Sequence, residues 1–516
     1  MVFNARANFA RTFYKGEISM NRYVKTPDAV HYNDILNNDL VLSSSLFVKL
    51  VMPNTNTKRL AELLSRPLKR SDLGTEVGSL SYIKKSTKYF IRTKALQDSS
   101  YLPDMNSETC LPILPKEFVN MNLKEGDVII SKDSNIGEVV ILDQDYPNCM
   151  LSGAIYKLPI KAEWKYYTLA FIKHKIFREQ LDAIVPKGAT IRHAKTKFLD
   201  CLIPLPNTDL ENIVQYVSLL TQAIINKEKL IKQRHADILK LIDNELRNNQ
   251  KANVFRYNNP NINDLQKVGR LDASLYSVFY QENIFRIINY TNGYAPLTEQ
   301  KLKLYPGPSL ELKLLGTRID SDKYINGFYR LITPKQITNY GTVKFEQYIG
   351  TPAKIKNIKY GDILFGESGT GRTLVYLDND GNSINNAHAH VLRSELPNDL
   401  ERIITIRSIL QYYKETGLTD CLTVGGSGGH LSPSYFDRLF IPNFPKIKQK
   451  EIATLYYNPA EYNANDCTIE SFLDYDTEYN GTAGIYELDK TAKHLKEILD
   501  DAIDKIVKNQ EVEVKF

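Results

Sequence analysis

The chain has 516 residues, which is too long for one ordinary hydrophobic core, so its length predicts two large halves. Hydrophobic residues at 42 % and charged residues at 24 % are typical of a globular protein and exclude a disordered one. The formal net charge of +6 permits a polyanionic partner but does not identify one.

Membrane and secretory roles are not expected from the sequence. It has no run of about 18 apolar residues that could span a bilayer, and no cationic start before an apolar core that would make a secretory signal. The cysteines are scattered singly without a CxxC pair, which favours reduced thiols in the cytoplasm over a zinc site. They are Cys110, Cys149, Cys201, Cys421 and Cys467. We therefore expect a cytoplasmic protein with no membrane partner.

The first half reads as a β-rich domain. Short apolar runs bounded by polar turns predict strands at Tyr89–Arg92, Asp127–Ser131 and Glu138–Leu142. A helical pattern follows at Lys165–Ile184. Gly188–Pro206 then combines a glycine-containing loop with an apolar run that ends in the letters IPLP.

A long amphipathic stretch ends the first half. From Thr208 to about Asn249, apolar residues fall largely on heptad a and d positions, which predicts a long helix with a coiled-coil seam. Those residues are Leu210, Ile213, Val217, Leu220, Ile224, Ile231, Ile238 and Leu241. The helix would be roughly 60 Å long at about 1.5 Å per residue. A helix packed only on its own domain is the alternative that the pattern leaves open.

The second half repeats the first about 235 positions later. Glu125–Leu142 and Tyr360–Leu377 both read as an apolar strand, a short polar loop with glycine and a second apolar strand. Gly428–Pro445 lies downstream of the second copy as Gly188–Pro206 lies downstream of the first. Two features at nearly the same offset indicate an internal duplication. In this half we expect strands at Gly327–Ile332, Asp362–Phe365 and Thr373–Leu377, and a helix at Asp399–Thr416.

A second helix is predicted near the end of the chain. Tyr486–Val507 carries one apolar face, formed by Leu488, Ala492, Leu495, Leu499, Ile503 and Ile506. A polar insertion rich in Asn and Tyr, about Tyr456–Gly484, separates this helix from its domain and has no copy in the first half. The two predicted helices could pair antiparallel and fix the separation of two domains.

The predicted fold class is α+β, with two similar β-rich domains, each followed by a long helix, and with the helices pairing as an antiparallel coiled coil. The expected divisions are residues 1–207 for the first domain, 208–250 for the central helical spacer, 251–455 for the second domain, and 456–516 for the insertion and C-terminal helical spacer.

Motifs for catalysis and metal binding are sparse. Gly366–Thr373 nearly spells a phosphate-binding loop, but Arg372 replaces the lysine, and a strand-like run replaces the helix that would hold the anion. His388 and His390 lie two apart, which on a strand would place both rings on one face for a metal; a pair of polar surface residues is the alternative. No adenine-methyltransferase signature or convincing nuclease set is found. No catalytic, cofactor-binding or metal-binding residue is therefore assigned.

Several loops combine the residue types that contact nucleic acids. Arg and Lys bind phosphates, whereas Asn, Gln, Arg and Ser can also bind base edges. Any one such cluster is more often a solvated face, but these clusters recur at corresponding places in the two halves. The predicted DNA-contacting residues are Lys132, Ser134, Asn135, Lys187, Arg192, His193, Lys195, Lys197, Glu367, Ser368, Thr370, Arg372, Asn385, Asn386, His388 and His430.

The duplicated strand-loop-strand motif resembles an element of the specificity (S) subunit of Type I restriction–modification systems. The similar residues are Gly126–Ser131 with Ile136-Gly137, and Gly361–Phe365 with Gly369–Gly371. They match the family's GDIL-type element in its target recognition domains.

Other stretches extend this resemblance over roughly positions 85–250 and 268–507. The runs that end at Pro206 and Pro445 are similar to the family's strand before the long helix, and Arg270–Tyr276 is similar to the start of a second recognition domain. Residues 1 to about 85 and the insertion depart from the family pattern.

The resemblance implies a DNA-reading subunit without catalysis of its own. Each domain would read one half of a split double-stranded DNA target, and the helices would set the gap and dock methyltransferase (modification) subunits, which would recruit restriction subunits. No cofactor is expected in this chain, because S-adenosylmethionine, ATP and Mg²⁺ would belong to the partners. Two alternatives stay open: a restriction or methylation enzyme with degenerate motifs, and a non-DNA two-domain adaptor protein.

Overall fold

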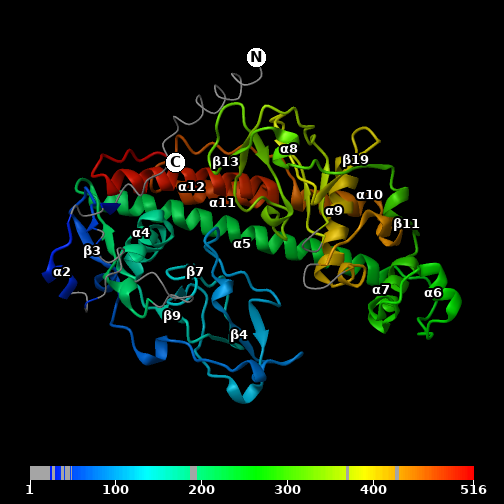
Figure 1. The fold of residues 1–516 in the computed structure, drawn as a ribbon, viewed down its shortest axis with the longest axis horizontal. Helices are drawn as coiled ribbons and strands as arrows, with labels where there is room; N and C mark the ends of the chain where they lie inside the picture. The colour runs from blue at the N-terminus through cyan, green and yellow to red at the C-terminus, as the bar shows by residue number, and fades with distance from the viewer. Residues whose placement is uncertain are drawn as a thin grey trace. The chain divides into compact units, whose positions relative to one another are not determined.

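The computed structural model describes residues 24–25, 29–36, 40, 47, 49–185, 194–367, 371–424 and 429–516. The chain divides into two compact units. The first unit is Met1–Leu230, Glu461–Gly481 and Leu488–Phe516, and the second unit is Ile231–Ala460 and Thr482–Glu487. Both units combine helices with small β-sheets (Figure 1), which confirms the predicted α+β class.

The first unit is built from short strands and a few helices. Its strands are β1 (Val24–Lys25), β2 (Lys49–Leu50), β3 (Thr57–Arg59), β4 (Tyr89–Ile91), β5 (Cys110–Pro112), β6 (Val128–Ser131), β7 (Val139–Ile141), β8 (Cys149–Leu151), β9 (Ile155–Leu158) and β10 (Leu202–Pro204). Its helices are α2 (Tyr32–Leu36), α3 (Lys165–Lys173) and α4 (Lys175–Ile184), with most of α11 (Phe472–Thr482) and α12 (Ile485–Val507) and part of α5 (Leu210–Asn248).

The second unit has a similar content. Its strands are β11 (Tyr294–Pro296), β12 (Leu302–Tyr305), β13 (Ile319–Ser321), β14 (Tyr329–Leu331), β15 (Tyr348–Gly350), β16 (Ile363–Gly366), β17 (Thr373–Val375), β18 (Ser383–Ile384), β19 (Ala389–Ser394) and β20 (Phe440–Pro442). Its helices are α6 (Ile262–Val268), α7 (Val278–Ile288), α8 (Leu312–Leu315), α9 (Leu400–Glu415) and α10 (Lys446–Tyr456), with the rest of α5.

Three groups of strand pairings in the first unit recur in the second. Strand β6 pairs antiparallel with β7 and β9, as β16 pairs with β17 and β19. Strand β4 pairs antiparallel with β5 and parallel with β8, as β14 pairs with β15 and β18. The antiparallel pairs β3–β10 and β11–β20 are the third match. The duplication that the sequence indicated is therefore also present in the sheet topology.

The repeated Gly-Asp motif makes the same turn in both units. Gly126 and Gly361 have positive φ angles of 80° and 81°, which glycine adopts without the steric cost of a Cβ. The carboxylates of Asp127 and Asp362 each accept a hydrogen bond from the backbone N–H three residues earlier, at 2.8 and 2.7 Å. The motif therefore fixes the entry into β6 and β16 and has a structural role.

The repeated strands lie in the cores of their units. Every residue of β6, β7, β16 and β17 is buried. Because side chains alternate along a strand, Val128 and Ile130 join the cluster that contains α3 and α4, whereas Ile129 joins a second cluster. Helix α9 packs on β17 in the second unit. The helix predicted at Lys165–Ile184 is two helices, because His174 is extended and its ring caps α4 through Ile176 N.

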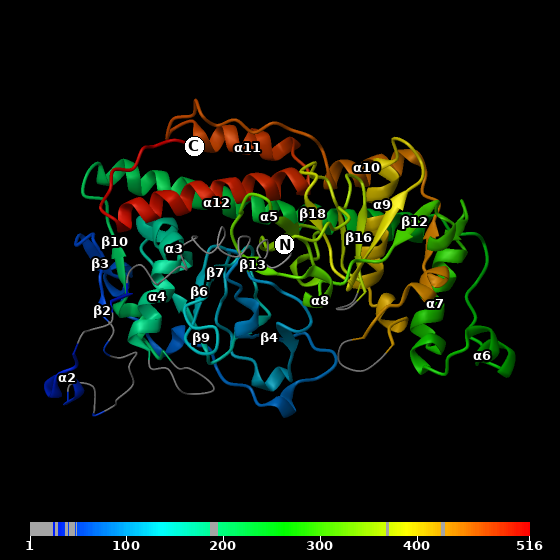
Figure 2. The ribbon, with the colours of Figure 1, turned by 45° about the horizontal axis from the view of Figure 1, so that its top comes forward.

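Helix α5 confirms the long helix that the heptads predicted. It has 39 residues, and six of the eight apolar residues that predicted it are buried; Leu210 is exposed and Leu241 is half-buried. In the first unit, α5 residues such as Val217 and Leu220 share one core with Leu499 and Ile503 of α12, and the two helices lie side by side (Figure 2).

The packed parts of α5 and α12 run in opposite directions. Asn207, just before α5, donates from Nδ2 to Asn509 Oδ1, just after α12, at 2.5 Å. Further along α5, Glu228 pairs with Lys496 of α12 at 2.7 Å. The helices are thus antiparallel neighbours in the first unit, whereas a coiled-coil geometry stays a prediction.

The insertion contains a helix that the sequence analysis did not predict. Helix α11 is held to α5 by a buried ion pair, in which Lys227 Nζ lies 2.5 Å from Asp476 Oδ1 and 2.7 Å from Asn480 Oδ1. The rings of Tyr462 and Tyr479 lie within 5.0 Å of the same ammonium group. The insertion therefore packs on α5 as a third helix of the first unit.

Helix α10 also differs from the expected arrangement. It follows β20 directly, as α5 follows β10, but it ends at Tyr456 where the insertion begins. The second half therefore has a short helix in the place of α5, and the long helix α12 comes only after the insertion. Across the described ranges, no helix is both long and apolar enough to cross a membrane.

Candidate nucleic-acid interface

The loops predicted to contact DNA converge at one junction in each unit. In the second unit, Glu367 follows β16; its N–H donates to His388 O at 2.9 Å, and its carbonyl accepts from Leu431 N at 3.1 Å. In the first unit, Lys132 follows β6; its N–H donates to Ala154 O at 2.8 Å, and its carbonyl accepts from Ala194 N at 2.9 Å. The same backbone contacts therefore join the strand end, the loop before β9 or β19 and the loop before β10 or β20.

A glycine permits close backbone approach beside each junction. A Cβ on Gly307 would lie 1.9 Å from Asn386 O, and a Cβ on Gly74 would lie 2.1 Å from Ser152 O. Both distances are far inside van der Waals contact, so a larger residue would displace the loop that precedes β19 or β9. The absence of a side chain at these two glycines therefore leaves room for the loop at each junction.

A groove of about 1130 Å³ lies beside the junction of the second unit, and we call it the second-unit groove. It is lined by the segment before α8, by β13, by the turn after β14 and by the loop before β19. Three predicted residues line it: Arg372, Asn386 and His388. The polar side chains that the structure adds are Ser309, Glu311, Arg318, Asp320, Thr333, Lys335 and Gln347.

The added groove residues were missed because none lies in a duplicated motif. Lys335 and Gln347 both come after the predicted strand Gly327–Ile332, in loops with no periodic pattern. Arg318 and Asp320 lie on and beside β13, which pairs with β15 about 30 positions later in the chain. Only a basic residue beside a turn was available as a signal, and that signal is too common to be specific.

The other predicted residues of the second unit have different surroundings. Glu367 Oε2 lies 3.3 Å from the Nε2 of buried His390, and Asn385 is 2 % exposed and donates from Nδ2 to Ala389 O at 2.8 Å. His430 is exposed, and its backbone pairs with Val424. Arg372 donates from Nη1 to Ile337 O at 3.2 Å, and its buried Nε has no hydrogen-bond partner among the described residues. Ser368 and Thr370 lie outside the described residues.

The predicted residues of the first unit surround its junction. Lys132 Nζ pairs with Asp133 at 2.7 Å, while Ser134 and Asn135 are exposed in the loop between β6 and β7. Lys195 and Lys197 are exposed on the segment that follows Ala194. Lys187, Arg192 and His193 lie outside the described residues.

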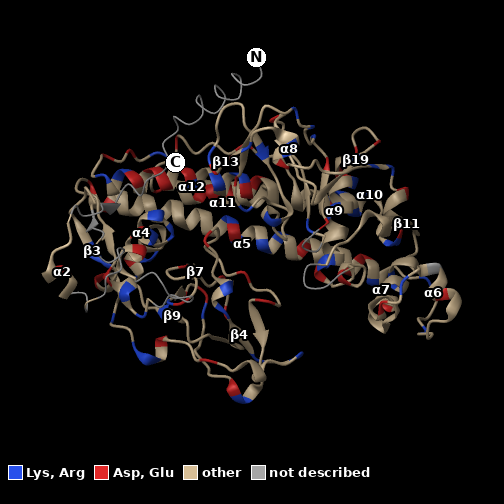
Figure 3. Cartoon of the chain, in the orientation of Figure 1, with Lys and Arg blue, Asp and Glu red and all other residues tan. Residues whose placement is uncertain are grey.

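Charge alone does not mark the interface. Figure 3 shows basic and acidic residues interspersed along the ribbon of both units. In the groove, the carboxylate of Asp320 binds Arg318 through two hydrogen bonds of 2.9 and 2.7 Å, and this pairing raises the pKa of the arginine. Lys335 projects from its turn and is exposed.

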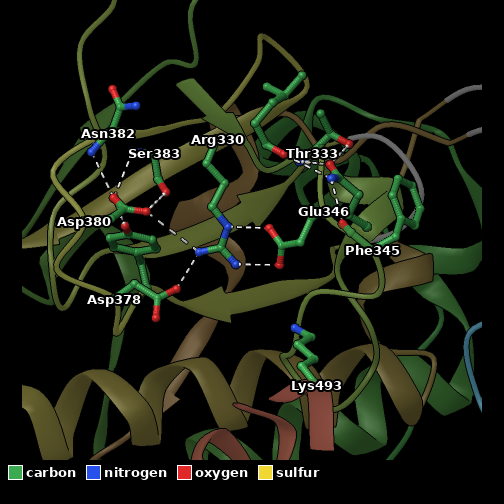
Figure 4. Close-up of polar contacts among 12 residues, drawn as sticks. Arg330, Thr333, Phe345, Glu346, Asp378, Asp380, Asn382, Ser383 and Lys493 are labelled. Atoms are coloured by element: carbon green, nitrogen blue, oxygen red, sulfur yellow. Dashed lines mark hydrogen bonds and ion pairs between the residues drawn. The ribbon is translucent and has the colours of Figure 1, made fainter. Parts of the chain in front are cut away.

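A polar network around the half-buried Arg330 supports the groove wall formed by β14 (Figure 4). Arg330 donates from Nε and Nη2 to the two oxygens of Glu346 at 2.6 and 2.9 Å, and from Nη1 to Asp378 at 2.5 Å. Burial lowers the pKa of Arg330, but the ion pairs with Glu346 and Asp378 outweigh burial and raise it overall. Because the two acids come from separate loops, Arg330 ties both loops to β14.

The turn that presents Lys335 is fixed by a buried glutamine. Gln336 Oε1 accepts from Thr333 N at 2.7 Å and from Thr333 Oγ1 at 2.6 Å. Its Nε2 donates to Leu331 O at 3.0 Å and to Phe345 O at 3.1 Å. A fully satisfied buried amide makes a rigid turn, so Lys335 is held at the groove before any ligand binds.

The surroundings of the Gly366–Thr373 loop do not suit a phosphate site, and those of His388 and His390 do not suit a shared metal site. Gly366 ends β16 and Thr373 begins β17, so a strand follows the loop, as the sequence predicted, where an anion site would need a helix. His388 is exposed in the groove, whereas His390 is buried on β19 against Phe436, so the two rings do not share a face. Within the described part of the chain, no group of three or more His, Cys, Asp or Glu residues could hold a metal.

The chain matches no protein-family model and no curated protein sequence. Among solved structures, it is similar to the Type-I restriction-modification system S subunit from M. genitalium, at 12 % identity and a TM-score of 0.39, covering 87 % of this chain and 95 % of that chain. It is also similar to the HsdS subunit from Thermoanaerobacter tengcongensis, at 13 % identity and a TM-score of 0.25, covering 88 % and 97 %.

A third similar chain comes from a structure of complex assembly and conformational transition in the type I R-M system, at 14 % identity and a TM-score of 0.27, covering 88 % and 98 %. The resemblance to Type I specificity subunits that the motifs indicated is thus also found among solved structures. Because all three TM-scores are below 0.5, the similarity does not locate a site or assign a function, which depend on this chain's own residues.

Proposed function

We propose that the chain is the DNA sequence-specificity subunit of a Type I restriction–modification complex, and that it recognises a bipartite double-stranded target. Residues 1–207 and 251–455 would each read one half of that target. The observation that carries this proposal is the duplicated junction, where matching backbone contacts gather basic and amide side chains around Lys132 and Glu367. Basic groups suit phosphates and amides suit base edges.

Two linked readers gain specificity from their connection. Once one half-site is bound, the other reader meets its own half-site at a high effective concentration, provided that the spacer matches the DNA. Each correct bidentate contact contributes about 1–3 kcal/mol of discrimination, so a few contacts per half are sufficient.

The methylation and cleavage of DNA are assigned to partner chains. Methyltransferase subunits would dock on the helical spacers, residues 208–250 and 456–516, and restriction subunits would join through them. S-adenosylmethionine, ATP and Mg²⁺ would be bound by those partners, so that this chain is a non-catalytic subunit. The complex would act in the cytoplasm, where it meets unmodified DNA.

Selection from random duplex DNA tests the proposal. The full chain, purified with its methyltransferase subunit, is incubated with a random pool, and bound DNA is sequenced. Two short enriched blocks separated by a fixed gap are expected. Enrichment of no motif, or of one continuous block, would overturn the proposal.

The same protein preparation distinguishes the two alternatives. Methylation or cleavage of DNA by this chain without partners would favour an enzyme. Binding to DNA that is absent, or that does not depend on sequence or salt even with the partner present, would favour a protein adaptor.

A further inference from the structure

One arginine of the second-unit groove is held in a fixed orientation by a carboxylate. Arg318 Nε and Nη2 donate to the two oxygens of Asp320, and Nη1 donates to Leu310 O at 3.3 Å. A guanidinium group carries five N–H donors, so these three bonds leave two for another partner. The Arg318 side chain is 30 % exposed and lines the groove, so a ligand in the groove can reach those donors.

We propose that Arg318 reads a guanine in the target half that the second unit recognises. Guanine presents two adjacent acceptors, O6 and N7, in the major groove, and an arginine fork matches both. Because Asp320 already fixes the guanidinium plane, little side-chain freedom remains to be lost on binding. This inference rests on the proposed DNA-reading function. It adds which residue makes the contact and which base is recognised.

The surroundings of Arg318 favour a base edge over a phosphate. The Asp320 side chain is 47 % exposed beside it, and a carboxylate there would repel a phosphate but can accept a hydrogen bond from cytosine N4. Gln347 Nε2 lies 3.5 Å from Asp320 and adds an amide to the same wall. Lys335, exposed on its rigid turn, suits a phosphate contact instead.

The proposed contact belongs to one half of the target. Strand β13, which carries Asp320, has no counterpart among the described strands of the first unit. The closest equivalent there is a single bridge between Tyr82 and Ile113, beside β5. Substituting Arg318 should therefore alter one base position in one block of the motif and leave the other block unchanged.

Selection from random duplex DNA is repeated with variants of the full chain together with its methyltransferase subunit. Arg318→Ala should lose the preference for one guanine by roughly five- to 150-fold, measured with four duplexes that differ at that base pair. Arg318→Lys should also lose it, because a point charge does not replace the fork. Asp320→Asn should weaken the preference less. Arg256→Ala removes an exposed arginine outside the groove and should leave the motif unchanged.

The outcomes separate this inference from the proposed function. If the wild-type chain selects no motif, the proposed function itself fails. If it selects a split motif but Arg318→Ala keeps every base preference, or weakens binding to all sequences equally, Arg318 is not the guanine reader and the proposed function stands. A variant whose thermal unfolding midpoint equals that of the wild type has kept its fold.

Discussion

Lys335 lies on a turn whose conformation is fixed before a ligand binds. Its turn, Pro334–Gln336, is held by the four hydrogen bonds of Gln336, and the adjoining strand is held by Arg330. Neither support depends on a ligand. A basic side chain on such a turn can meet a phosphate without ordering the loop first, which lowers the entropic cost of binding.

Lys335→Ala and Arg372→Ala should each weaken DNA binding while folding and partner assembly stay intact. If Lys335 contacts a phosphate, its loss should reduce affinity similarly for all sequences and reduce the salt dependence of log K by about one. Fluorescence anisotropy over a range of salt concentrations measures both effects.

Arg192→Ala is expected to weaken binding in the same way. Unchanged binding or target methylation in the Arg372 and Arg192 variants would show that these loops do not contact DNA.

Lys173 gives the first unit a pH-dependent stability. Burial lowers the pKa of Lys173 from its ordinary 10.5 to about 8, although the nearby Glu138 carboxylate opposes the shift. Between pH 8 and 10.5 the unfolded chain therefore binds a proton that the folded chain does not, so this group's contribution to stability rises with pH.

A Lys173→Met variant tests this titration. The unfolding free energy of the wild type, minus that of the variant, should increase from pH 8 to pH 10 in denaturant titrations. Lys116→Met, at an exposed site, should show no such increase. A difference that stays constant over the range, or that falls, would contradict the assigned pKa shift.

The sequence predicted the loops of the site but not the groove. Lys132 and Glu367 lie in the duplicated motif, so their recurrence was visible. Asp320 and Gln347 approach each other only because β13 pairs with β15, and short strands joined by irregular loops leave no periodic signal for such pairing. The buried role of Asn385 was equally hidden, because an asparagine in a loop suits a turn as well as a base.

At the scale of the elements, a buried ion pair joins α5 to the insertion. Lys227 and Asp476 are 0 % and 1 % exposed, so each charge depends on the other. Lys227→Met should destabilise the first unit by about 3–5 kcal/mol, because it leaves a carboxylate buried without its counter-ion. Chemical denaturation measures the change.

The double variant Lys227→Met/Asp476→Leu provides the matched control. Because it removes both charges together, it should recover much of the stability lost by the single variant. A single variant as stable as the wild type would show that α11 is not held by this pair.

Changing the length of α5 should change the spacing of the recognised site. Inserting seven residues, two helical turns, between Thr208 and Asn249 adds about 10.5 Å. That length corresponds to roughly three base pairs at 3.4 Å each. Selection should then return a longer gap between the same two blocks, whereas altered blocks or an unchanged gap would contradict the spacer role.

The two long helices were predicted better than the shorter helices around them. The heptads of α5 and the apolar face of α12 gave both helices to within two residues, because a sustained period is a local signal. Helix α11 was missed because its sequence, FLDYDTEYNGT, has no clear apolar face and is stabilised by contacts with α5 and the C-terminal residues. Helix α10 was missed as the direct counterpart of α5 because the insertion interrupts the repeat.

For the whole molecule, duplication is the property that sequence and structure share. The two copies share five strand pairings and the same junction contacts, yet other features differ: Lys132 corresponds to Glu367, and among the described strands β12 and β13 occur in the second unit alone. Equal scaffolds with different surface residues suit two readers of different sequences. This division explains why the scaffold was predictable from the repeat and the contact residues were not.

Methylome sequencing of a host that expresses this chain with its methyltransferase subunit tests the central claim most directly. We expect methylated adenines in one split motif, with two defined blocks and a gap of constant length, and no such motif when this chain is omitted. Methylation without this chain, or at a single undivided motif, would contradict the claim that two duplicated units each read one half of the target.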